Sequence, residues 1–355
     1  FLQENINLIT NNMKTNFVKL RWLFTMLLFV TTMIMPTMML AKSIDLKIPE
    51  GDGAGTPYKI GTAEELYWFA GLVNGTLPGV KKDLSANAIL TDDIIVNTGV
   101  LDPNKDLVSG NDFIEWIPIG KSSSDDDAYT GTFDGNGHTI SGLYFNKSNS
   151  WYVGLFGCIG AEGKISNVGV SDSYFQSSNC PYIGGVCGSN SGELQNCSNS
   201  STVIGKENEY RIGGVCGYNY GGTIKSCYNT ASVSGQYSVG GVCGDNYEGP
   251  ITNCYYLSGT VADGKGGIGG KDDENGKAVE MSKDRFKSGE VAWLLNGSKS
   301  VSTEESTLAW YQKLGENADA YPVLTSTGDN TVYGGYQHGS RVRFFSNTVQ
   351  HSTGE

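Results

Sequence analysis

The sequence predicts an all-β solenoid of the parallel β-helix type, with a capping helix at the N-terminal end and a small α+β cap at the C-terminal end. Three observations lead to this prediction. The chain holds 49 glycines among 355 residues, about twice the usual share of ~7%. One motif recurs four times at a spacing of 27 to 31 residues. The repeats lack helical periodicity and contain short apolar runs separated by Gly, Asn and Ser, which indicates stacked strands.

Composition excludes several other classes of protein. Collagen needs Gly at every third position and abundant Pro, whereas this chain has only 9 prolines and no such period. The content of hydrophobic residues, 39%, is too high for an acidic disordered chain. The net charge is −12 and no stripe of Lys and Arg is present, so we expect no nucleic-acid partner.

The amino end is expected to lie outside the fold. Residues 1–12 precede the first methionine, Met13, and are interpreted as an artefactual segment upstream of the natural start. Residues 13–41 then run from basic to apolar to small, which is the layout of a secretory signal peptide. An uncleaved anchor is the alternative, but Pro36 interrupts the apolar stretch, and a span needs about 20 apolar residues. Cleavage would leave an exported protein without a membrane span.

Residues 56–83 are predicted to form the N-terminal cap. Thr62 followed by Glu65 is a capping box, which marks a helix start. Apolar residues then recur at helical spacing, and Asn74-Gly75 is a stop signal. An open stack of strands exposes unpaired backbone at its end, so we expect this amphipathic helix to cover the first coil.

The β-helix itself is predicted to span residues 84–262. Three stretches before the repeats read as strands, namely Asn87 to Val96, Phe113 to Gly120 and Gly131 to Phe145. Loops are expected at Leu101 to Asn111 and at Lys121 to Ala128.

The four repeats occupy residues 152–262, and their equivalent positions should form columns along the solenoid. The aligned glycines are Gly154, Gly185, Gly214 and Gly241. One buried apolar column is predicted at Ile165, Leu194, Ile224 and Ile251. A second column is predicted at a turn, formed by Asn190, Asn219 and Asn246. Asn tolerates left-handed dihedrals at turns, and stacked amides can bond to one another along a column.

These repeats resemble the GLUG motif, which is named for a Gly-Leu-x-Gly core. The first repeat contains that core as Gly154-Leu155-Phe156-Gly157, and later repeats have Val for Leu and Cys at the variable position. The resemblance implies a right-handed β-helix in a secreted or surface protein of bacteria. GLUG repeats also accompany immunoglobulin A-cleaving metallopeptidases. Their zinc motif needs two His four residues apart, and His138, His338 and His351 do not have that spacing, so peptidase activity is not implied.

The remainder of the chain is divided into three parts. Residues 263–279 are rich in Gly and charge and are interpreted as a linker. Residues 280–336 are predicted to form the C-terminal cap, including a helix that begins at Ser288 and ends at Asn296-Gly297. Residues 337–355 are interpreted as a tail.

Six of the eight cysteines occur in register in the repeats. Cys187, Cys216 and Cys243 share one repeat position, and Cys197, Cys227 and Cys254 share another. Two interpretations compete. The thiols are either small buried groups stacked in columns, which we favour, or each coil carries its own disulfide, such as Cys187 to Cys197, as export permits. No metal-site spacing is present, and we expect no metal or cofactor.

Tyrosines are the candidate binding residues. Tyr220 and Tyr247 share a repeat position, as do Tyr228 and Tyr255. Outward-facing columns would suit a sugar or a protein surface, whereas inward-facing columns would be packing, which is the favoured interpretation.

The expected function is non-catalytic adhesion or binding to an unidentified extracellular glycan or protein, from a secreted or cell-surface location. No catalytic residues are predicted. A carbohydrate-active β-helix enzyme is the alternative. Such an enzyme would need clustered carboxylates for acid–base catalysis. Such clusters occur only at Asp92-Asp93, Asp125-Asp126-Asp127 and Asp272-Asp273-Glu274, in or beside expected loops. A structural stalk is the second alternative.

Overall fold

The computed structural model describes residues 13, 42, 44–122, 124, 126–179, 182–206, 210–262, 265–269, 277–298, 308–315, 317–324, 332–338 and 341–346, the last two ranges as backbone. The chain divides into two units, Phe1–Ser43 and Ile44–Glu355. The predicted upstream segment and, apart from Met13, the predicted signal peptide lie outside the described residues. The sheets lie in the second unit.

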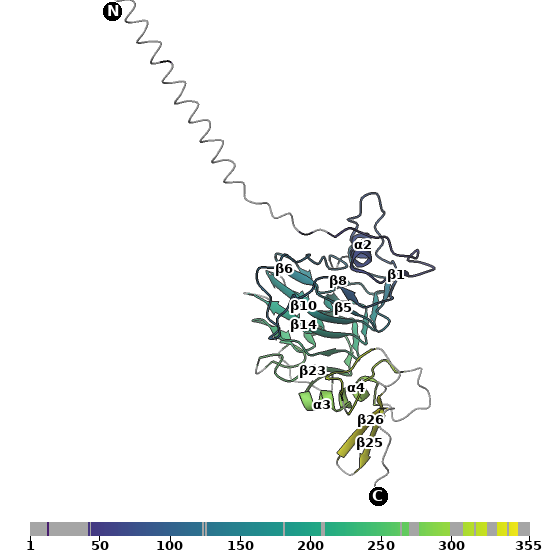
Figure 1. Ribbon diagram of the computed structural model, residues 1–355, viewed down its shortest axis with the longest axis vertical. Helices are drawn as coiled ribbons and strands as arrows, with labels where there is room; N and C mark the ends of the chain where they lie inside the picture. The colour runs from purple at the N-terminus through teal and green to yellow at the C-terminus, as the bar shows by residue number, and fades with distance from the viewer. Residues whose placement is uncertain are drawn as a thin grey trace, which may run out of the picture. The chain divides into compact units, whose positions relative to one another are not determined.

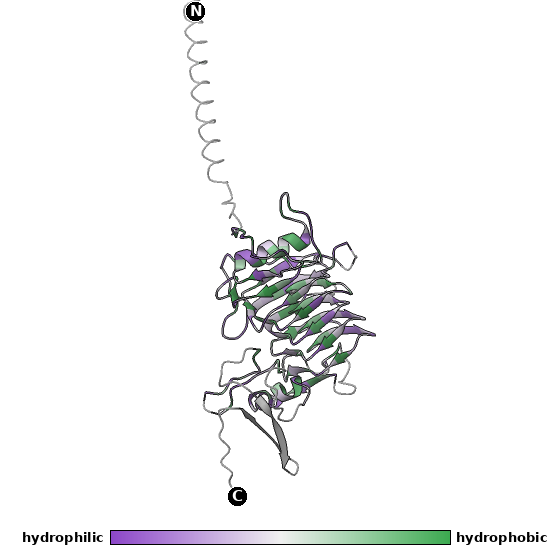
Figure 2. Cartoon of the chain, turned by 90° about the vertical axis from the view of Figure 1, so that its right-hand side faces the viewer, coloured by the Kyte–Doolittle hydropathy of each residue, from purple (hydrophilic) through white to green (hydrophobic). Residues whose placement is uncertain are grey.

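The second unit is a parallel β-solenoid, which confirms the predicted fold class (Figure 1). Its strands are short and stack into four parallel sheets that run along the coil axis. Consecutive coils pair in parallel because the chain returns to the same corner after each turn of the solenoid. Along the stacked strands polar and apolar residues alternate (Figure 2).

The four sheets have the following strands. The first contains β1 (Tyr58–Ile60), β2 (Ala88–Leu90), β4 (Thr132–Asp134), β9 (Lys164–Ser166), β13 (Glu193–Gln195), β17 (Thr223–Lys225) and β22 (Ile251–Thr252). The second contains β3 (Ile94–Ile95), β5 (Thr139–Ser141), β10 (Gly169–Ser178), β14 (Ser198–Gly205), β18 (Tyr228–Asn229), β23 (Cys254–Leu257) and β24 (Ala278–Met281), with β6 (Tyr144–Ser148) and β19 (Val233–Ser234) at its side. The third contains β7 (Tyr152–Val153), β11 (Tyr182–Gly184), β15 (Ile212–Gly213) and β20 (Val239–Gly240). The fourth contains β8 (Phe156–Ile159), β12 (Cys187–Asn190), β16 (Cys216–Tyr220) and β21 (Cys243–Tyr247).

The apolar column of the first sheet lies in the core. Leu194 pairs in register with Ile165 and Ile224, and Ile224 pairs with Ile251. All four side chains are buried. In β9, β13 and β17 the central side chain is the buried one, because successive side chains alternate between the two faces of the sheet. Each of these coils therefore adds one apolar side chain from the first sheet to the core.

Two consecutive glycines of the repeat serve different purposes. A Cβ at Gly213 would overlap the backbone carbonyl oxygen of Cys216, so the corner between the third and fourth sheets requires glycine. A Cβ at Gly214 would overlap the side-chain amide of Asn229, which is buried.

The first two repeats differ in length at the corner between the third and fourth sheets. Val153 pairs with Ile183 and Phe156 with Cys187, so the second repeat has one more residue than the first at this corner.

The asparagine column is a hydrogen-bonded ladder, and its residues lie in strands instead of at the predicted turn. Asn190 Nδ2 donates to Asn219 Oδ1, and Asn219 Nδ2 donates to Asn246 Oδ1, both at 2.8 Å. These residues lie in strands β12, β16 and β21. A column of residues with positive φ occurs instead at another corner, at Asn167, Asn196, Ser226 and Asn253. The ladder amides instead bond to the turn that follows each strand, as Asn219 Nδ2 does to Gly222 O at 2.7 Å.

Helix α2 (Ala63–Asn74) covers the first coil (Figure 1). Thr62 Oγ1 accepts a hydrogen bond from Glu65 N at 3.3 Å, and Gly75 ends the helix with φ of 65°. The Glu65 carboxylate accepts from Gly61 N at 2.9 Å and pairs with Lys47 at 2.6 Å. The fully buried side chains of Leu66, Phe69 and Val73 join the core, and each contributes ~1.5–3 kcal/mol.

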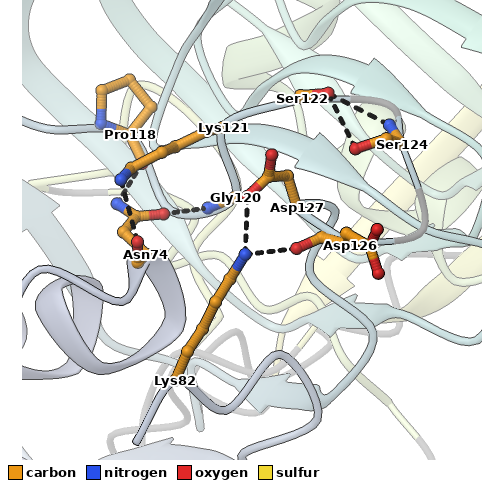
Figure 3. Close-up of polar contacts among 9 residues, drawn as sticks. All are labelled: Asn74, Lys82, Pro118, Gly120, Lys121, Ser122, Ser124, Asp126 and Asp127. Carbon is orange, nitrogen blue, oxygen red and sulfur yellow. Dashed lines mark hydrogen bonds and ion pairs between the residues drawn. The ribbon is translucent and has the colours of Figure 1, made fainter. Parts of the chain in front are cut away.

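Polar contacts fasten the end of α2 to a neighbouring loop (Figure 3). The Asn74 side chain donates to Pro118 O at 2.9 Å and accepts from Gly120 N at 3.0 Å. Lys121 Nζ donates to the backbone oxygen of Asn74 at 2.8 Å. Lys82 pairs with Asp127 at 2.6 Å and also bonds to the backbone oxygen of Asp126. The loop predicted at Lys121 to Ala128 is therefore held against the cap.

The stretch predicted as a strand at Phe113 to Gly120 forms only isolated bridges, from Glu115 to Tyr144 and from Ile119 to Phe156. The preceding loop instead packs outside the second sheet. There Phe113, Val100 and Tyr174 form a small separate apolar cluster. Trp116 and Ile119 of this stretch are nevertheless buried in the main core, so the apolar pattern correctly indicated burial but not continuous strand pairing.

The solenoid extends beyond its predicted end at residue 262. Residues 278 and 279 of the predicted linker belong to β24, which extends the second sheet, and Ile268 forms a parallel bridge with Cys243. Helix α3 (Lys283–Lys287) has Ser282 as its N-cap, and α4 (Glu290–Leu295) begins after Gly289 at φ of 87°. Ser288 is thus the C-cap of α3, not the predicted N-cap of α4, because the intervening left-handed turn needs glycine.

The predicted tail also contains regular structure. Strand β25 (Val332–His338) pairs in antiparallel fashion with β26 (Arg341–Ser346). The hairpin crosses the boundary that was placed between residues 336 and 337. Residues 347–355 lie outside the described part of the chain.

Candidate functional site

The two predicted tyrosine pairs have opposite environments. Tyr220 and Tyr247 pair in register, with ring centroids 5.4 Å apart and planes within 13°. Their exposed fractions are 55% and 51%. Tyr228 and Tyr255 also pair in register, but their exposed fractions are only 6% and 5%. Tyr220 and Tyr247 therefore face outward, and Tyr228 and Tyr255 face inward.

Tyr228 and Tyr255 are not available to a ligand, which corrects their inclusion among the candidate binding residues. They share an apolar cluster with the C-terminal cap, where Trp310 is fully buried. The ring of Trp310 lies 5.1 Å from that of Tyr228, and Tyr228 OH donates to Pro322 O at 2.7 Å. Desolvation by burial raises the pKa of Tyr228 well above its ordinary value, so this phenol remains a neutral donor.

Five tyrosines form a connected row that we call the tyrosine ladder, composed of Tyr152, Tyr182, Tyr218, Tyr220 and Tyr247. Tyr152 and Tyr182 stack at 5.1 Å, and Tyr182 and Tyr218 stack at 5.4 Å. Tyr218 then lies 5.9 Å from Tyr220 in a tilted arrangement. The ladder includes residues of the third and fourth sheets, from β7 to β21.

The ladder changes sheet at Tyr218. Tyr152 and Tyr182 are in register on β7 and β11, whereas Tyr218 is in register with Ser189 on the fourth sheet. Arg211 lies over this junction, with its guanidinium carbon 5.4 Å from the Tyr182 centroid and 4.6 Å from that of Tyr218. Its Nε donates to Asp245 Oδ2 at 2.8 Å. Cation–π contacts of this kind contribute about 0.5–2 kcal/mol each, so Arg211 holds both rings in place.

Part of the ladder borders an open groove of about 510 Å³. Four tyrosines line this groove, namely Tyr152, Tyr182, Tyr218 and Tyr220. The other lining residues are small, apolar or hydroxylated: Ala128, Cys158, Ile159, Gly160, Ala161, Ser189, Ser191 and Gly221. Burial raises the pKa of Tyr218 above its ordinary value, against the opposing effect of Arg211. The surface therefore offers apolar rings and neutral hydroxyl groups.

The sequence analysis did not identify Tyr152, Tyr182 or Tyr218 as candidate binding residues. A signal for Tyr152 and Tyr182 was present, because both stand two residues before the first glycine of their repeats. Tyr218 had no such signal. It stacks on Tyr182, which belongs to a different sheet. Contact between two sheets depends on the shape of the coil, which the repeat period does not give.

The cysteines form columns of free thiols in the described part of the chain. Cys216 pairs in register with Cys187 and Cys243, and the sulfurs of Cys187 and Cys216 are 3.5 Å apart. The second set lies at another corner, where Cys197, Cys227 and Cys254 each direct Sγ at the backbone oxygen two residues earlier, at 3.2–3.3 Å. Burial raises the pKa of Cys216 well above its ordinary value, so its nucleophilic thiolate form is suppressed.

Asp93, Asp126 and Asp127, three described residues of the acidic clusters, contact other parts of the chain. Asp93 Oδ1 accepts from Thr139 N at 2.8 Å, and Asp126 and Asp127 contact Lys82. Asp125 and the cluster Asp272-Asp273-Glu274 lie outside the described residues. Within the described ranges no group of three or more His, Cys, Asp or Glu side chains is arranged to hold a metal ion.

No helix among the residues that the structure describes has the length and apolarity needed to cross a membrane.

The fold and the ladder define a parallel β-solenoid that presents an aromatic surface on Gly-rich repeats. The family model described as the GLUG motif matches residues 208–234, which contain the third repeat. The chain therefore carries a GLUG motif at its third repeat, and the resemblance seen in the sequence is confirmed there.

Two curated relatives match short parts of the chain. Halomucin of Haloquadratum walsbyi is 38% identical over 84 residues, which is 24% of this chain and 1% of the relative. A protein of Evansella cellulosilytica, provisionally named a Gly-rich membrane protein, is 33% identical over 78 residues, which is 22% of this chain and 9% of the relative. The matches thus span only a small fraction of either relative.

One solved structure is similar over much of the chain. It is a Bacteroides ovatus protein proposed to be an immunoglobulin A1 protease, with 17% sequence identity and a TM-score of 0.43. The alignment covers 79% of this chain and 95% of that one. A similarity at that TM-score does not establish a shared fold.

Proposed function

We propose that this protein acts outside the cell as a non-catalytic binding protein, and that it contacts an extracellular glycan or protein through the tyrosine ladder. The observation that carries the proposal is the exposure of Tyr220 and Tyr247, each more than half accessible, beside a groove lined by four tyrosines. Exposed apolar groups that cluster beside a concavity mark interaction sites more often than singly scattered ones do.

The order of the ladder supports a binding role. Tyrosine combines a broad apolar ring with a polar tip, so one side chain can contact both apolar and hydroxyl groups of a ligand. The rings are held by stacking and by Arg211 before any ligand arrives. Side chains that are already fixed lose less conformational entropy on binding.

The chemistry of the groove supports a non-catalytic role. None of its lining side chains is Asp, Glu, His, Lys or Arg, and His is the side chain that acts most often in acid–base catalysis. Cys158 lines the groove, but desolvation raises the pKa of its thiol to about 12. This thiol is therefore almost entirely neutral near pH 7 and is a poor nucleophile.

A location at the cell surface is supported by the repeats and by one relative. Short repeats that stack into a solenoid are suited to extended binding surfaces. The Evansella cellulosilytica relative is named a membrane protein, and the basic, apolar and small pattern of residues 13–41 has the layout of an export signal.

The test is a glycan and extracellular-matrix array with the intact chain, run beside an assay for released reducing sugar ends. The double variant Tyr220→Ala/Tyr247→Ala should lose binding by at least about tenfold, or 1.4 kcal/mol. The matched control is Tyr210→Ala/Tyr237→Ala, a second exposed stacked pair at 5.0 Å that does not line the groove. Release of sugar ends would favour the enzyme, and equal losses in both double variants would contradict the ladder as the site.

A further inference from the structure

We propose that the groove of the tyrosine ladder continues past Tyr152 into a second subsite built on Trp151, and that together they bind an extended, neutral oligosaccharide. This inference rests on the proposed function and specifies its ligand.

The second subsite is a separate pocket of about 450 Å³. Its apolar lining comes from Ile117, Pro118, Phe145 and Trp151, and Tyr152 lines both this pocket and the groove of the ladder. The two concavities therefore meet at one side chain. Each volume lies within the range of about 300–1,000 Å³ found for small-molecule sites, so a ligand that fills both must be longer than one compact group.

Trp151 is exposed to an unusual degree for its size. Its exposed fraction is 64%, whereas Trp68, Trp116 and Trp310 are all nearly buried. Ile117 in the same pocket is 47% exposed. Leaving a large aromatic side chain in water forgoes roughly 1.5–3 kcal/mol of burial energy. The two exposed apolar side chains together form a patch of the kind that marks an interaction site.

Trp151 and the ladder present different chemistry to a ligand. Each ladder ring has at least one face shielded by its stacked neighbour, as at Tyr220 and Tyr247. Trp151 has no ring contact among the described aromatic residues, so its indole face is the open aromatic platform of the surface. A sugar ring has an apolar C–H face and a rim of hydroxyl groups. The indole suits the first and the neutral phenols suit the second.

The charge distribution favours a neutral ligand over an acidic one. The ladder groove has no charged lining residue, and the second pocket has one, Lys121. Lys121 Nζ already donates to the backbone oxygen of Asn74 at 2.8 Å. The chain as a whole carries −12, which repels polyanions. A protein partner usually brings a polar and partly charged rim, for which these two linings offer few counterparts.

The experiment measures affinity against ligand length with the intact chain. The probes are β-1,4-linked glucose and mannose oligomers and α-1,4-linked glucose oligomers, from monosaccharide to hexasaccharide, with galacturonic acid oligomers of equal length as the acidic comparison. At least one neutral series should bind, with affinity rising at least about tenfold from monosaccharide to tetrasaccharide. The acidic series should bind more weakly, and tryptophan emission should shift to the blue as Trp151 is covered.

Variants separate this inference from the proposed function. Trp151→Ala should lower tetrasaccharide affinity at least about tenfold and remove both the length dependence and the blue shift, while Trp151→Phe should retain part of the affinity. Tyr237→Ala is the matched control and should bind normally, and thermal unfolding should confirm that all variants are folded. Unchanged binding by Trp151→Ala, together with weaker binding by Tyr220→Ala, would overturn the second subsite and leave the proposed function standing. Binding to protein alone would do the same, whereas no binding on any array would overturn both.

Discussion

The two tyrosine pairs of the third and fourth repeats follow one sequence pattern and end in opposite environments. Tyr220 and Tyr247 stack at the surface, whereas Tyr228 and Tyr255 pair in register and are buried in one apolar cluster with the C-terminal cap. Only eight residues separate the two positions within a coil. The repeat determines which residues stack, because equivalent positions share a column. Whether a column is covered depends on a segment that arrives about 80 residues later in the chain, at Trp310.

The largest expected effect comes from removing that cover. Trp310 is fully buried, contacts the ring of Tyr228 and donates through Nε1 to Ser226 O at 3.1 Å. Trp310→Ala should lower the free energy of unfolding by about 3–5 kcal/mol, as measured by urea denaturation. The exposed Trp151→Ala should change it by no more than about 0.5 kcal/mol. Similar losses in the two variants would show that the cap does not bury Tyr228.

The next largest effect is expected for the hydrogen-bonded column of Asn190, Asn219 and Asn246. Asn219 is buried between Asn190 and Asn246 and bonds to both. In Asn219→Ala, buried polar atoms on each side lose a partner, and each unpaired group costs ~1–3 kcal/mol. Thermal unfolding should show clear destabilisation, while Lys225→Ala, at an exposed position of the next strand, should be nearly neutral. A neutral Asn219→Ala would mean that the amide bonds do not hold the coils together.

The exposed pair itself should matter little for stability. Cross-strand aromatic pairs contribute about 0.2–1 kcal/mol, so Tyr220→Ala/Tyr247→Ala should unfold within about 1 kcal/mol of the wild type while losing ligand. The same substitutions at Tyr228 and Tyr255 should destabilise by several times as much. If the surface pair proved as costly as the buried pair, its tyrosines would be structural and the binding proposal would lose its main support.

The smallest expected effect is a pH dependence at the opposite end of the solenoid. Burial alone raises the pKa of Glu65, but the hydrogen bonds from Lys47 and Gly61 N outweigh it, and the net pKa is lowered. A carboxyl group with a lowered folded pKa stabilises the fold above its unfolded pKa, about 4.3 for Glu. That stability is lost as pH falls through the folded pKa.

Glu65→Gln should therefore reduce stability at pH 7 and flatten its fall below about pH 4. The effect should stay under about 1 kcal/mol because Lys47 is largely exposed. Glu64→Gln, its neighbour in the first turn of α2, is the control. A steeper acid transition in Glu65→Gln than in the wild type would contradict this assignment.

The sequence predicted the structure correctly where either a local rule or the repeat period was sufficient. The end of helix α2 at Gly75 can be predicted from the neighbouring residues alone. The apolar column from Ile165 to Ile251 can be predicted from the repeat period alone. Prediction from the sequence failed where a contact between distant segments decided the outcome. The addition of β24 to the second sheet and the burial of Tyr228 both depend on how the C-terminal segment folds back on the last coil.

The candidate site was predicted in part for the same reason. Tyr220 and Tyr247 were found because they recur in the repeat. The stacking of Tyr218 on Tyr182 was not, because these rings belong to different sheets and meet only through the width of the coil. Trp151 was not predicted because tryptophan does not recur at its repeat position, which holds Pro181, Tyr210 and Tyr237 in the later repeats.

Tyrosine nitration mapped by mass spectrometry, with and without bound ligand, tests the central claim most directly. Tyr220 and Tyr247 should react readily in the free protein and become protected when ligand binds, in step with the affinity measured separately. Tyr228 and Tyr255 should remain unreactive in both states while the chain is folded. Nitration of Tyr228 at the rate of Tyr220, or a ligand that binds without protecting Tyr220 and Tyr247, would contradict the assignment of the exposed ladder as the binding surface.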